Sequence, residues 1–382
     1  MRKVVCLFLV LVLLVGVLPP RAAAVELDVE GKSALLMDAA TGTVLYEKNA
    51  HEKLAPASVT KVMTMLLIME AIDSGRISWD DSVTASEAAA AKGGSQVYLK
   101  AGETMSVTDM LKSIAVSSAN DCACAMAEHI AGSEAAFVGM MNKRAAELGM
   151  QDTNFVNCTG LDDDPQAKDH VTSAYDIALM SRQLLTAHPD IKKFTTIWMD
   201  TIRDGTFGLS NTNKLVRFYQ GCTGLKTGFT AAAGYCLSAS AQRDGLELIA
   251  VVMGGETSQA RFGACKQMLD YGFANFALVT PQLTGDPTVN VKLGTTNVVH
   301  AVAAQRIPLL VDKAQRNDLT TQIDLQKEVT APVSQGQKLG MLTVKVGDQV
   351  LAQIPLVAAQ GVSRLSWWQV FVGVLRKITM AA

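Results

Sequence analysis

The chain has 382 residues, of which 49% are hydrophobic and 18% are charged, with 29 glycines and 10 prolines. A chain of this composition can bury a sizeable core, which excludes wholesale disorder, and its glycines and prolines are too few for a collagen-like or low-complexity sequence. The formal net charge of -2 lacks the basic excess that is typical of general nucleic-acid binders, so no nucleic-acid partner is expected. The length suggests two or three folding units.

The first 24 residues have the pattern of a secretory signal peptide. Arg2 and Lys3 form a positively charged start, and an apolar stretch of 15 residues follows over 4–18. The alanines at 22–24 then provide the small residues of a cleavage site. A transmembrane anchor is the alternative, but the stretch is shorter than the roughly 20 residues that span a bilayer. We therefore predict that residues 1–24 are removed and that the mature protein works outside the cytoplasm.

Residues 25–277 are predicted to form one α+β domain. A hairpin is expected over 33–46, with its turn at Gly42, and a buried helix is expected over 56–72, where apolar residues surround the helix axis nearly completely. Because strands precede and follow a long helical region, the sheet is expected to be assembled from both ends of the domain. The other expected helices lie around 106–130, 134–148, 173–186 and 259–276, and the other expected strands lie at 234–241 and 246–254.

The sequence changes in character after this domain. From 278 to 361, prolines and glycines separate short runs of alternating polarity, which predicts a small all-β domain. Residues 362–382 are predicted to form an amphipathic helix, because its polar positions recur every three or four residues. Trp367, Trp368 and the cations near the end of this segment suit a helix that lies on a membrane surface. A helix docked on the protein's own core is the alternative.

Six cysteines remain after the predicted cleavage, because Cys6 lies in the signal peptide. An even number in an exported protein suggests disulfides, but these cysteines lie in apolar segments of a large chain and match neither a CxxC pair nor a zinc site. Buried free thiols are therefore the main expectation. A single bridge between Cys222 and Cys236, which flank a predicted hairpin, is the alternative.

Three short motifs carry the candidate chemistry, and the first is Ser58-Val59-Thr60-Lys61 at the start of the predicted buried helix. Ser58 and Lys61 are nearly one helical turn apart, so their side chains lie on the same face. A serine hydroxyl needs a base to become a nucleophile, and a lysine in apolar surroundings has a lowered pKa that allows its amine to serve as that base. Taken alone, the motif is better explained as an ordinary helix start with an exposed lysine, because Ser-x-x-Lys recurs by chance in many chains.

The other two motifs offer groups that could bind a peptide. Ser118-Ala119-Asn120 lies in the helical region and provides a hydroxyl for proton relay and an amide for a peptide carbonyl. Lys226-Thr227-Gly228 provides a cation and a hydroxyl for a carboxylate on one strand edge, and its glycine lets substrate backbone approach closely. Each motif is weak by itself, because Ser118-Ala119-Asn120 could cap a helix and Lys226-Thr227-Gly228 could form a turn. The occurrence of all three in this order is typical of penicillin-binding proteins and class A β-lactamases.

The chain resembles the low-molecular-mass penicillin-binding proteins, a family of serine-type D-alanyl-D-alanine carboxypeptidases. The resemblance implies a penicillin-binding, β-lactamase-like transpeptidase fold without cofactor or metal, and the β-rich domain and amphipathic tail match the usual architecture of the family. It also implies removal of the terminal D-Ala from peptidoglycan pentapeptides through an acyl-enzyme, a reaction that β-lactam antibiotics inhibit covalently. The resemblance covers about residues 25–276 and, beside the three motifs, includes Leu36-Met37-Asp38, Thr41-Gly42-Thr43-Val44-Leu45, Pro56-Ala57-Ser58, Ser173-Ala174-Tyr175-Asp176 and Gly224-Leu225.

The same resemblance assigns roles to individual residues. Ser58 would be the acylated nucleophile and Lys61 its base, while Ser118 would relay protons and Asn120 would hold substrate. The other implied roles are contact of the substrate carboxylate with Lys226, Thr227 and Arg261, and an oxyanion hole formed by the backbone N–H groups of Ser58 and of Phe229, which follows Gly228. Two residues depart from the family pattern, because Ala119 stands where glycine or aspartate is common and Phe229 stands where histidine is usual. Both departures leave the backbone roles intact.

Three other functions share these residues or this fold. A class A β-lactamase needs a loop glutamate that activates the deacylating water, but residues 157–170 contain four aspartates and no glutamate. An endopeptidase acting on cross-linked muropeptides would use the same catalytic residues. A non-catalytic wall-binding protein would have no need of an intact Ser58 and Lys61. The preferred interpretation is a carboxypeptidase held on the outer face of the cytoplasmic membrane by residues 362–382.

Overall fold

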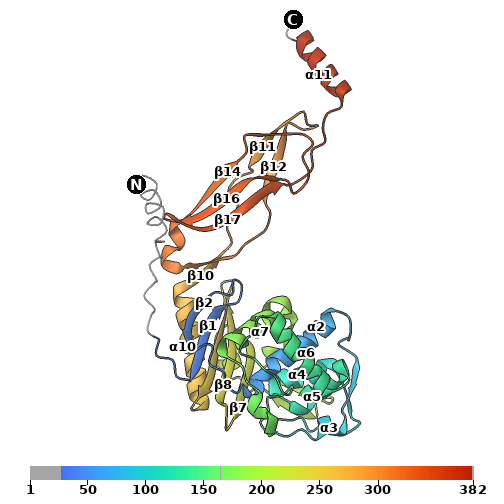
Figure 1. The fold of residues 1–382 in the computed structure, drawn as a ribbon, viewed down its shortest axis with the longest axis vertical. Coiled ribbons are helices and arrows are strands. Elements are labelled where there is room, and N and C mark those ends of the chain that lie inside the picture. The colour runs from blue at the N-terminus through green and yellow to red at the C-terminus, as the bar shows by residue number, and fades with distance from the viewer. Residues whose placement is uncertain (1–26, 164, 381–382) are drawn as a thin grey trace, which may run out of the picture.

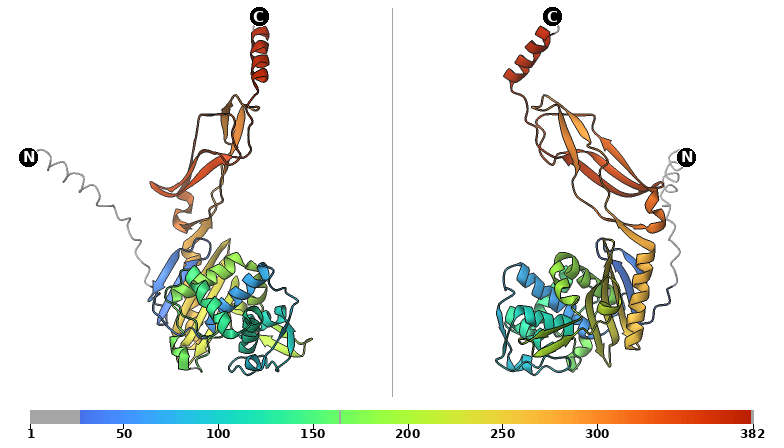
Figure 2. Two further views of the ribbon diagram at one scale, coloured as in Figure 1. Left: turned by 45° about the vertical axis from the view of Figure 1, so that its right-hand side comes forward. Right: turned by 180° about the vertical axis from the view of Figure 1, so that it is seen from behind.

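The computed structural model describes residues 27–163 and 165–380, so the predicted signal peptide lies outside the described residues. A mixed domain of helices and strands, a β-rich domain and a terminal helix follow one another along an elongated molecule (Figure 1). Two further views show that the β-rich domain separates the terminal helix from the mixed domain (Figure 2).

A five-stranded sheet forms the centre of the mixed domain, and its strands are β1 (Ser33–Asp38), β2 (Val44–Lys48), β7 (Cys222–Thr230), β8 (Gly234–Arg243) and β9 (Leu246–Gly255). All neighbouring pairs are antiparallel, in the order β2-β1-β9-β8-β7. The first strand of the domain therefore pairs with its last, and Leu35 lies opposite Val251. This confirms the prediction that both ends of the domain build the sheet, and it leaves β7 at an edge.

Helices cover both faces of this sheet. α10 (Ser258–Asn275) packs on one face, and α2 (Lys61–Asp73) and α7 (Ala174–Ala187) lie on the other (Figure 1). Side chains alternate along a strand, so β1 sends Leu35 into the core that contains α2 and sends Leu36 into the core that contains α10. The sheet is thus buried on both sides.

The predicted buried helix is α2, and it is preceded by a short 3-10 helix, η2 (Ala57–Thr60), in place of a continuous helix from residue 56. Residues 61–69 of α2 are all buried, which explains why the helix is apolar all round. The remaining helices of the domain are α3 (Glu87–Ala90), α4 (Val107–Ser117), α5 (Asn120–Ala131), α6 (Glu134–Glu147), α8 (Lys192–Thr195) and α9 (Leu215–Phe218). Two small hairpins pair β3 (Ser82–Thr84) with β4 (Thr104–Ser106) and β5 (Met199–Ile202) with β6 (Phe207–Ser210).

The helical region predicted around 106–130 is divided into α4 and α5. Ser118 ends α4 in the left-handed conformation, with a φ of 65°, which a helix cannot continue. Asn120 then starts α5, and its backbone N–H donates to the carbonyl of Ser95 at 2.7 Å. The second motif therefore lies at a break between two helices and not within one.

The β-rich domain has its own core of buried hydrophobic residues. β10 (Phe276–Val279) leads out of α10 and pairs with β13 (Leu309–Asp312). The main sheet has six strands in the order β14-β16-β17-β12-β11-β15, and these are β11 (Thr288–Lys292), β12 (Val298–Ala303), β14 (Leu319–Leu325), β15 (Glu328–Thr330), β16 (Lys338–Val346) and β17 (Gln349–Ala358).

The terminal helix, α11 (Trp367–Met380), begins later than the amphipathic segment predicted from residue 362. Val362 is buried in the core of the β-rich domain, and the backbone N–H of Leu365 donates to the carbonyl of Leu293 at 2.8 Å. Trp367 and Trp368 on α11 are mostly exposed. Over residues 27–163 and 165–380, no helix combines the length and the apolarity that crossing a bilayer would require.

All six cysteines of the described residues are free, and five of them are buried. The alternative of a Cys222–Cys236 bridge is wrong because of the strand register. Cys222 lies opposite Ala241 on β8, whereas Cys236 lies opposite Gly228 on β7, so the two side chains never face each other.

Candidate active site

Ser58 lies on the 3-10 helix η2, immediately before α2, where the sheet edge and the helical side of the domain meet. The turn is entered with Ala57 at a φ of 48°, and Val59 donates its N–H back to the carbonyl of Pro56. Ser58 is half-buried, and its Oγ accepts a hydrogen bond of 2.9 Å from Nζ of Lys61. The predicted juxtaposition of hydroxyl and amine is therefore present.

Lys61 is fully buried at the first position of α2. Burial lowers the pKa of its amine to about 7, although the nearby Cys158 and Asp121 partly oppose this shift. The amine also donates to the backbone carbonyl of Thr159 at 2.8 Å. A buried amine that is partly neutral at pH 7 and already in contact with Ser58 Oγ has the geometry of a general base.

The loop of residues 157–161 provides the second hydrogen-bond partner of the Lys61 amine, the carbonyl of Thr159. Oδ1 of Asn157 accepts hydrogen bonds from the N–H groups of Thr159 and Gly160, at 3.1 and 2.7 Å, and so fixes the turn. Gly160 has a φ of 80°, and a Cβ at this position would lie 1.8 Å from the carbonyl oxygen of Ala57. Only glycine lets the loop pack against the serine turn this closely.

His170 supports the serine turn as a neutral side chain. Its Nδ1 accepts from the N–H of Val156 at 3.0 Å, so the proton lies on Nε2, which is 2.8 Å from Oγ1 of Thr60. That hydroxyl in turn donates to the carbonyl of Ala57 at 2.8 Å. Burial, helped by the charge of Lys61, lowers the pKa of His170 to about 4, which keeps the imidazole uncharged near Lys61.

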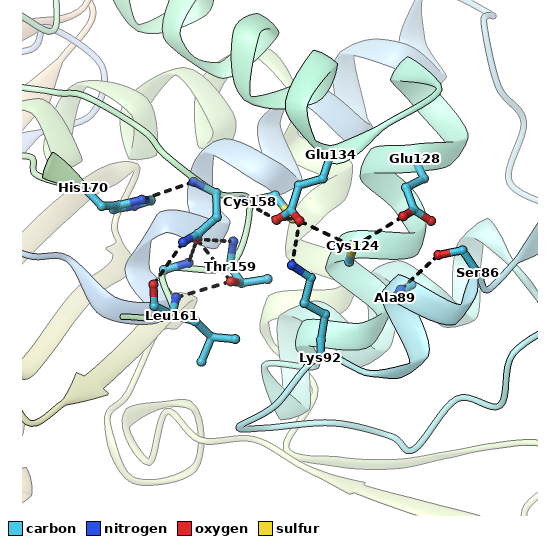
Figure 3. Close-up of polar contacts among 12 residues, drawn as sticks. Ser86, Ala89, Lys92, Cys124, Glu128, Glu134, Cys158, Thr159, Leu161 and His170 are labelled. Atoms are coloured by element: carbon cyan, nitrogen blue, oxygen red, sulfur yellow. Dashed lines mark hydrogen bonds and ion pairs between the residues drawn. The ribbon is translucent and has the colours of Figure 1, made fainter. Parts of the chain in front are cut away.

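A partly buried ion pair between Glu134 and Lys92 also holds this loop in place. Oε2 of Glu134 is 2.6 Å from Nζ of Lys92, and Oε1 accepts from both the backbone N–H and the thiol of Cys158 at 3.2 Å (Figure 3). Burial alone would raise the pKa of Glu134, but the hydrogen bonds from Lys92 and Cys158 outweigh it and lower the pKa. The carboxylate therefore stays charged and holds the loop in place.

The second motif presents one buried acceptor that is free. Asn120 is 2% exposed, and its Nδ2 donates to the carbonyl of Gly93 at 2.7 Å. Its Oδ1 has no hydrogen-bond partner among the described residues. An unsatisfied buried acceptor is costly, so it marks a place for a ligand donor such as a peptide N–H. Ser118 is buried at the helix break, and among the described residues its hydroxyl makes no hydrogen bond to Ser58 or Lys61.

The third motif lies on the edge strand β7, against the serine turn. A Cβ on Gly228 would lie 2.7 Å from the carbonyl oxygen of Pro56 and 3.0 Å from the backbone nitrogen of Ser58. Lys226 is fully buried, and its Nζ donates to the carbonyl of Thr227 at 2.9 Å. Burial, with the positive charges of Lys61 and Arg261, holds the pKa of Lys226 well below its usual value.

Arg261 comes from α10 and reaches the third motif from the end of the sheet. Its Nη1 donates to the carbonyls of Gly228 and Cys236 at 2.8 and 3.2 Å, and its buried Nε has no partner among the described residues. Phe229 is 53% exposed, and its ring lies tilted against that of Tyr235 with 4.3 Å between ring centroids. The side chain of Phe229 thus lies at the protein surface, while its backbone continues β7 past Ser58.

Ser58, Lys61, Gly228 and Arg261 therefore lie together between the edge strand and the helices, although they are far apart in the sequence. Lys226 is close enough to Lys61 and Arg261 for their charges to lower its pKa. Sequence reasoning missed the groups behind them, above all the carbonyl of Thr159 and the imidazole of His170. The pattern Asn157-x-x-Gly160 was an available signal for a tight turn. Nothing in the sequence placed that turn beside Lys61.

The model of the D-alanyl-D-alanine carboxypeptidase family matches residues 20–257. The chain belongs to this family. The model of the penicillin-binding protein 5 C-terminal domain matches residues 276–364 of the same carboxypeptidase. The family predicted from the three motifs is thereby confirmed, together with its fold: a low-molecular-mass penicillin-binding protein with a C-terminal all-β domain.

Relatives and solved structures agree with this assignment. The carboxypeptidase is 44% identical to D-alanyl-D-alanine carboxypeptidase DacF of Bacillus subtilis, over 89% of this chain and 87% of the relative. It is 34% identical to DacC of Escherichia coli, over 90% and 88%. The crystal structure of penicillin binding protein 5 from Haemophilus influenzae superimposes with a TM-score of 0.74 at 30% identity, covering 91% of this chain and 100% of that one. Penicillin-binding protein D2 from Listeria monocytogenes, solved with bound ampicillin, matches with a TM-score of 0.60 at 33% identity, over 65% and 100%.

Proposed function

We propose that Ser58 is the nucleophile with which this serine-type carboxypeptidase removes the terminal D-alanine from peptidoglycan pentapeptides. The observation that carries the proposal is the 2.9 Å hydrogen bond between Ser58 Oγ and the amine of Lys61, whose pKa is about 7. Neutral Lys61 takes the hydroxyl proton as Ser58 Oγ attacks the carbonyl of the penultimate D-Ala. The departing D-Ala takes up a proton, and water then hydrolyses the acyl-enzyme.

The oxyanion that forms during attack would be bound by the backbone N–H groups of Ser58 and Phe229. The fit at Gly228 supports this role, because only a residue without a side chain lets β7 come this close to the backbone nitrogen of Ser58. Donors fixed in this way stabilise charge without reorganising during the reaction. Ser118, buried where α4 ends, would relay the proton to the leaving group, and Oδ1 of Asn120 would accept a substrate N–H.

The terminal carboxylate of the substrate would bind beside Lys226, Thr227 and Arg261. Lys226 and Arg261 are buried, and no acidic side chain of the described residues forms an ion pair with either of them. Burial lowers the pKa of both side chains, and the positive charges of Lys61 and Arg261 lower that of Lys226 further. A substrate carboxylate would supply the missing counter-charge and make binding favourable. A β-lactam carries a carboxylate and a strained acyl bond, so it would enter by the same route and acylate Ser58.

The test of this function compares two pentapeptides ending in D-Ala-D-Ala, one with a free carboxylate and one amidated at its end. We expect free D-Ala from the acid, and turnover lower by about tenfold or more on the amide, because each charge-assisted hydrogen bond contributes roughly 1.5–3 kcal/mol. Release of D-Ala or D-Ala amide is measured by chromatography with purified mature protein. Equal rates on the two peptides would contradict the carboxylate role of Lys226, Thr227 and Arg261.

The cell-wall enzymes of this family act outside the cytoplasm, and we propose that this one is held on the outer face of the cytoplasmic membrane by α11. The support is the position of the helix at the far end of the molecule and the exposure of Trp367, Trp368 and Phe371 on it (Figure 2). The Phe371 ring stacks with both tryptophan rings, at centroid distances of 5.5 Å from Trp367 and 5.6 Å from Trp368. Inserting these rings at about 25 cal/mol per Å² would contribute several kcal/mol of attachment.

Deleting residues 366–382 should release an active enzyme from the membrane. The cut is placed at Ser366 because Val362 and Leu365 still belong to the β-rich domain. In washed vesicles we expect the truncated protein in the supernatant, with undiminished release of D-Ala, whereas the full-length variant Trp367→Ala/Trp368→Ala should be retained only partly. Retention of the truncated protein would instead place the anchor in an uncleaved segment at 4–18.

A further inference from the structure

Tyr98 is held in a conformation that its side chain disfavours. Its φ is 59°, in the left-handed region where a Cβ meets the backbone, and a bulky residue there is a genuine outlier. The side chain is also 68% exposed, which leaves an aromatic ring in water. Tyr98 is not part of a hairpin turn, where such a conformation would be expected. Strain of this kind persists only where the surroundings impose it, and it is concentrated at functional positions.

A single buried carboxylate imposes the conformation. Oδ2 of Asp121 accepts from the N–H groups of Val97 and Leu99, at 3.1 and 3.0 Å, and so fixes the residues on both sides of Tyr98. On the other side of the chain, Nη1 of Arg203 donates to the carbonyl of Val97 at 2.8 Å. Asp121 is completely buried, so this clamp is shielded from water.

The clamp ties Tyr98 to the active site. Asp121 directly follows Asn120 of the second motif. Asn120 itself binds the segment that leads to Tyr98, because its N–H donates to Ser95 and its Nδ2 donates to Gly93, both at 2.7 Å. The ring is therefore displayed from a segment that shares its anchor with the proposed substrate-binding amide.

Tyr98 also forms one wall of an open depression of about 700 Å³. Phe207 also lines the depression, and its ring contacts that of Tyr98 edge-on, with 6.4 Å between the ring centroids. Arg203 lies over the Phe207 ring at 5.2 Å and is fixed by Glu103, with 2.7 Å between Nε and Oε1. Lys100 completes the rim. The depression thus combines two aromatic faces with charged groups at its edge.

We propose that Tyr98 and this depression bind the part of the peptide stem that precedes D-Ala-D-Ala, and that Tyr98 is a specificity-determining residue for extended substrates. Aromatic walls suit the methylene groups of a long side chain, and the charged rim suits its polar end. This inference rests on the proposed carboxypeptidase function. Tyr98 touches no reacting atom, so it acts by positioning the stem. Its fixed backbone conformation holds the ring in the binding orientation before the substrate binds.

The test is a matched series at one position, measured on a short and a long substrate. Tyr98→Phe keeps the ring and the strain, Tyr98→Ala removes the ring and keeps the strain, and Tyr98→Gly removes both. The kcat/KM for D-Ala release is measured with N-acetyl-D-Ala-D-Ala and with the pentapeptide, and Tm is measured for each variant.

We expect Tyr98→Ala and Tyr98→Gly to lower kcat/KM about tenfold on the pentapeptide and by less than about twofold on the dipeptide, with Tyr98→Phe close to the wild type on both. Tyr98→Gly should also raise Tm, because it relieves the positive φ. Equal losses on both substrates, or no loss on the pentapeptide, would overturn the inference. Failure of the proposed function is distinct: the wild type would then release D-Ala from neither substrate, and the inference that rests on it would fall too.

Discussion

Replacing Ser58 by alanine is expected to abolish the covalent adduct with benzylpenicillin and to lower the release of D-Ala by about ten-thousand-fold or more. The reason is that no other hydroxyl of the described residues is in contact with Lys61, since the second hydrogen bond of its amine goes to a backbone carbonyl. The loss therefore removes the nucleophile itself and not only one stabilising contact. Intact-mass measurement of the mature protein after incubation with penicillin shows the adduct directly.

Ser74→Ala is the matched control for this substitution. Ser74 ends the same helix α2, and its hydroxyl donates only to the carbonyl of Ala71 at 3.1 Å, far along the helix from the active site. We expect the control to form the adduct at the wild-type rate. An adduct that persists in Ser58→Ala would mean that another residue is acylated, and peptide mapping would then identify that residue.

The groups that the sequence revealed are those whose relation is local. Ser58 and Lys61 share one helical turn, so their spacing alone predicted the contact that the structure contains. The turn at Gly42 between two short segments likewise predicted the hairpin of β1 and β2, which the structure contains. Sequence spacing and periodicity predict which residues lie side by side within one element, and they were sufficient for these local contacts.

The groups that the sequence did not reveal act across long separations and through the backbone. Thr159 binds Lys61 from 98 residues away by its carbonyl oxygen, which every residue possesses. His170 reaches Thr60 across 110 residues, and no metal-like spacing marked it. The break at Ser118 was hidden for the same reason, because the apolar positions on either side remain helical and the break depends on the contact of Asn120 with Ser95.

The pH dependence of acylation should follow the amine of Lys61. Its pKa is about 7, so the neutral base predominates above pH 7, and each unit below removes about nine tenths of what remains. The second-order rate of acylation by penicillin should therefore rise about tenfold from pH 5 to 6, then level off above pH 8. His170, with a pKa of about 4, stays neutral over this range and adds no step. Stopped-flow measurement with a chromogenic cephalosporin gives the profile.

Lys61→Arg and Lys61→Met separate the base from its charge. Both should lower acylation by about a thousand-fold or more at every pH, because a guanidinium cannot be deprotonated in this range and a thioether is no base.

The pH dependence of folding stability provides an independent measurement of the Lys61 charge. The unfolded chain binds a proton on this lysine up to about pH 10.5, whereas the folded chain releases it near 7, so this group makes the wild type gain stability as the pH rises from 7. Lys61→Met should lack that gain, and its Tm should exceed that of the wild type most clearly at pH 6, where the wild type must bury a charged amine. Two results together would contradict this role: an acylation rate that does not change near pH 7, and the same pH dependence of Tm in the wild type and Lys61→Met. They would show that Lys61 is charged in the resting enzyme and that another group removes the proton from Ser58.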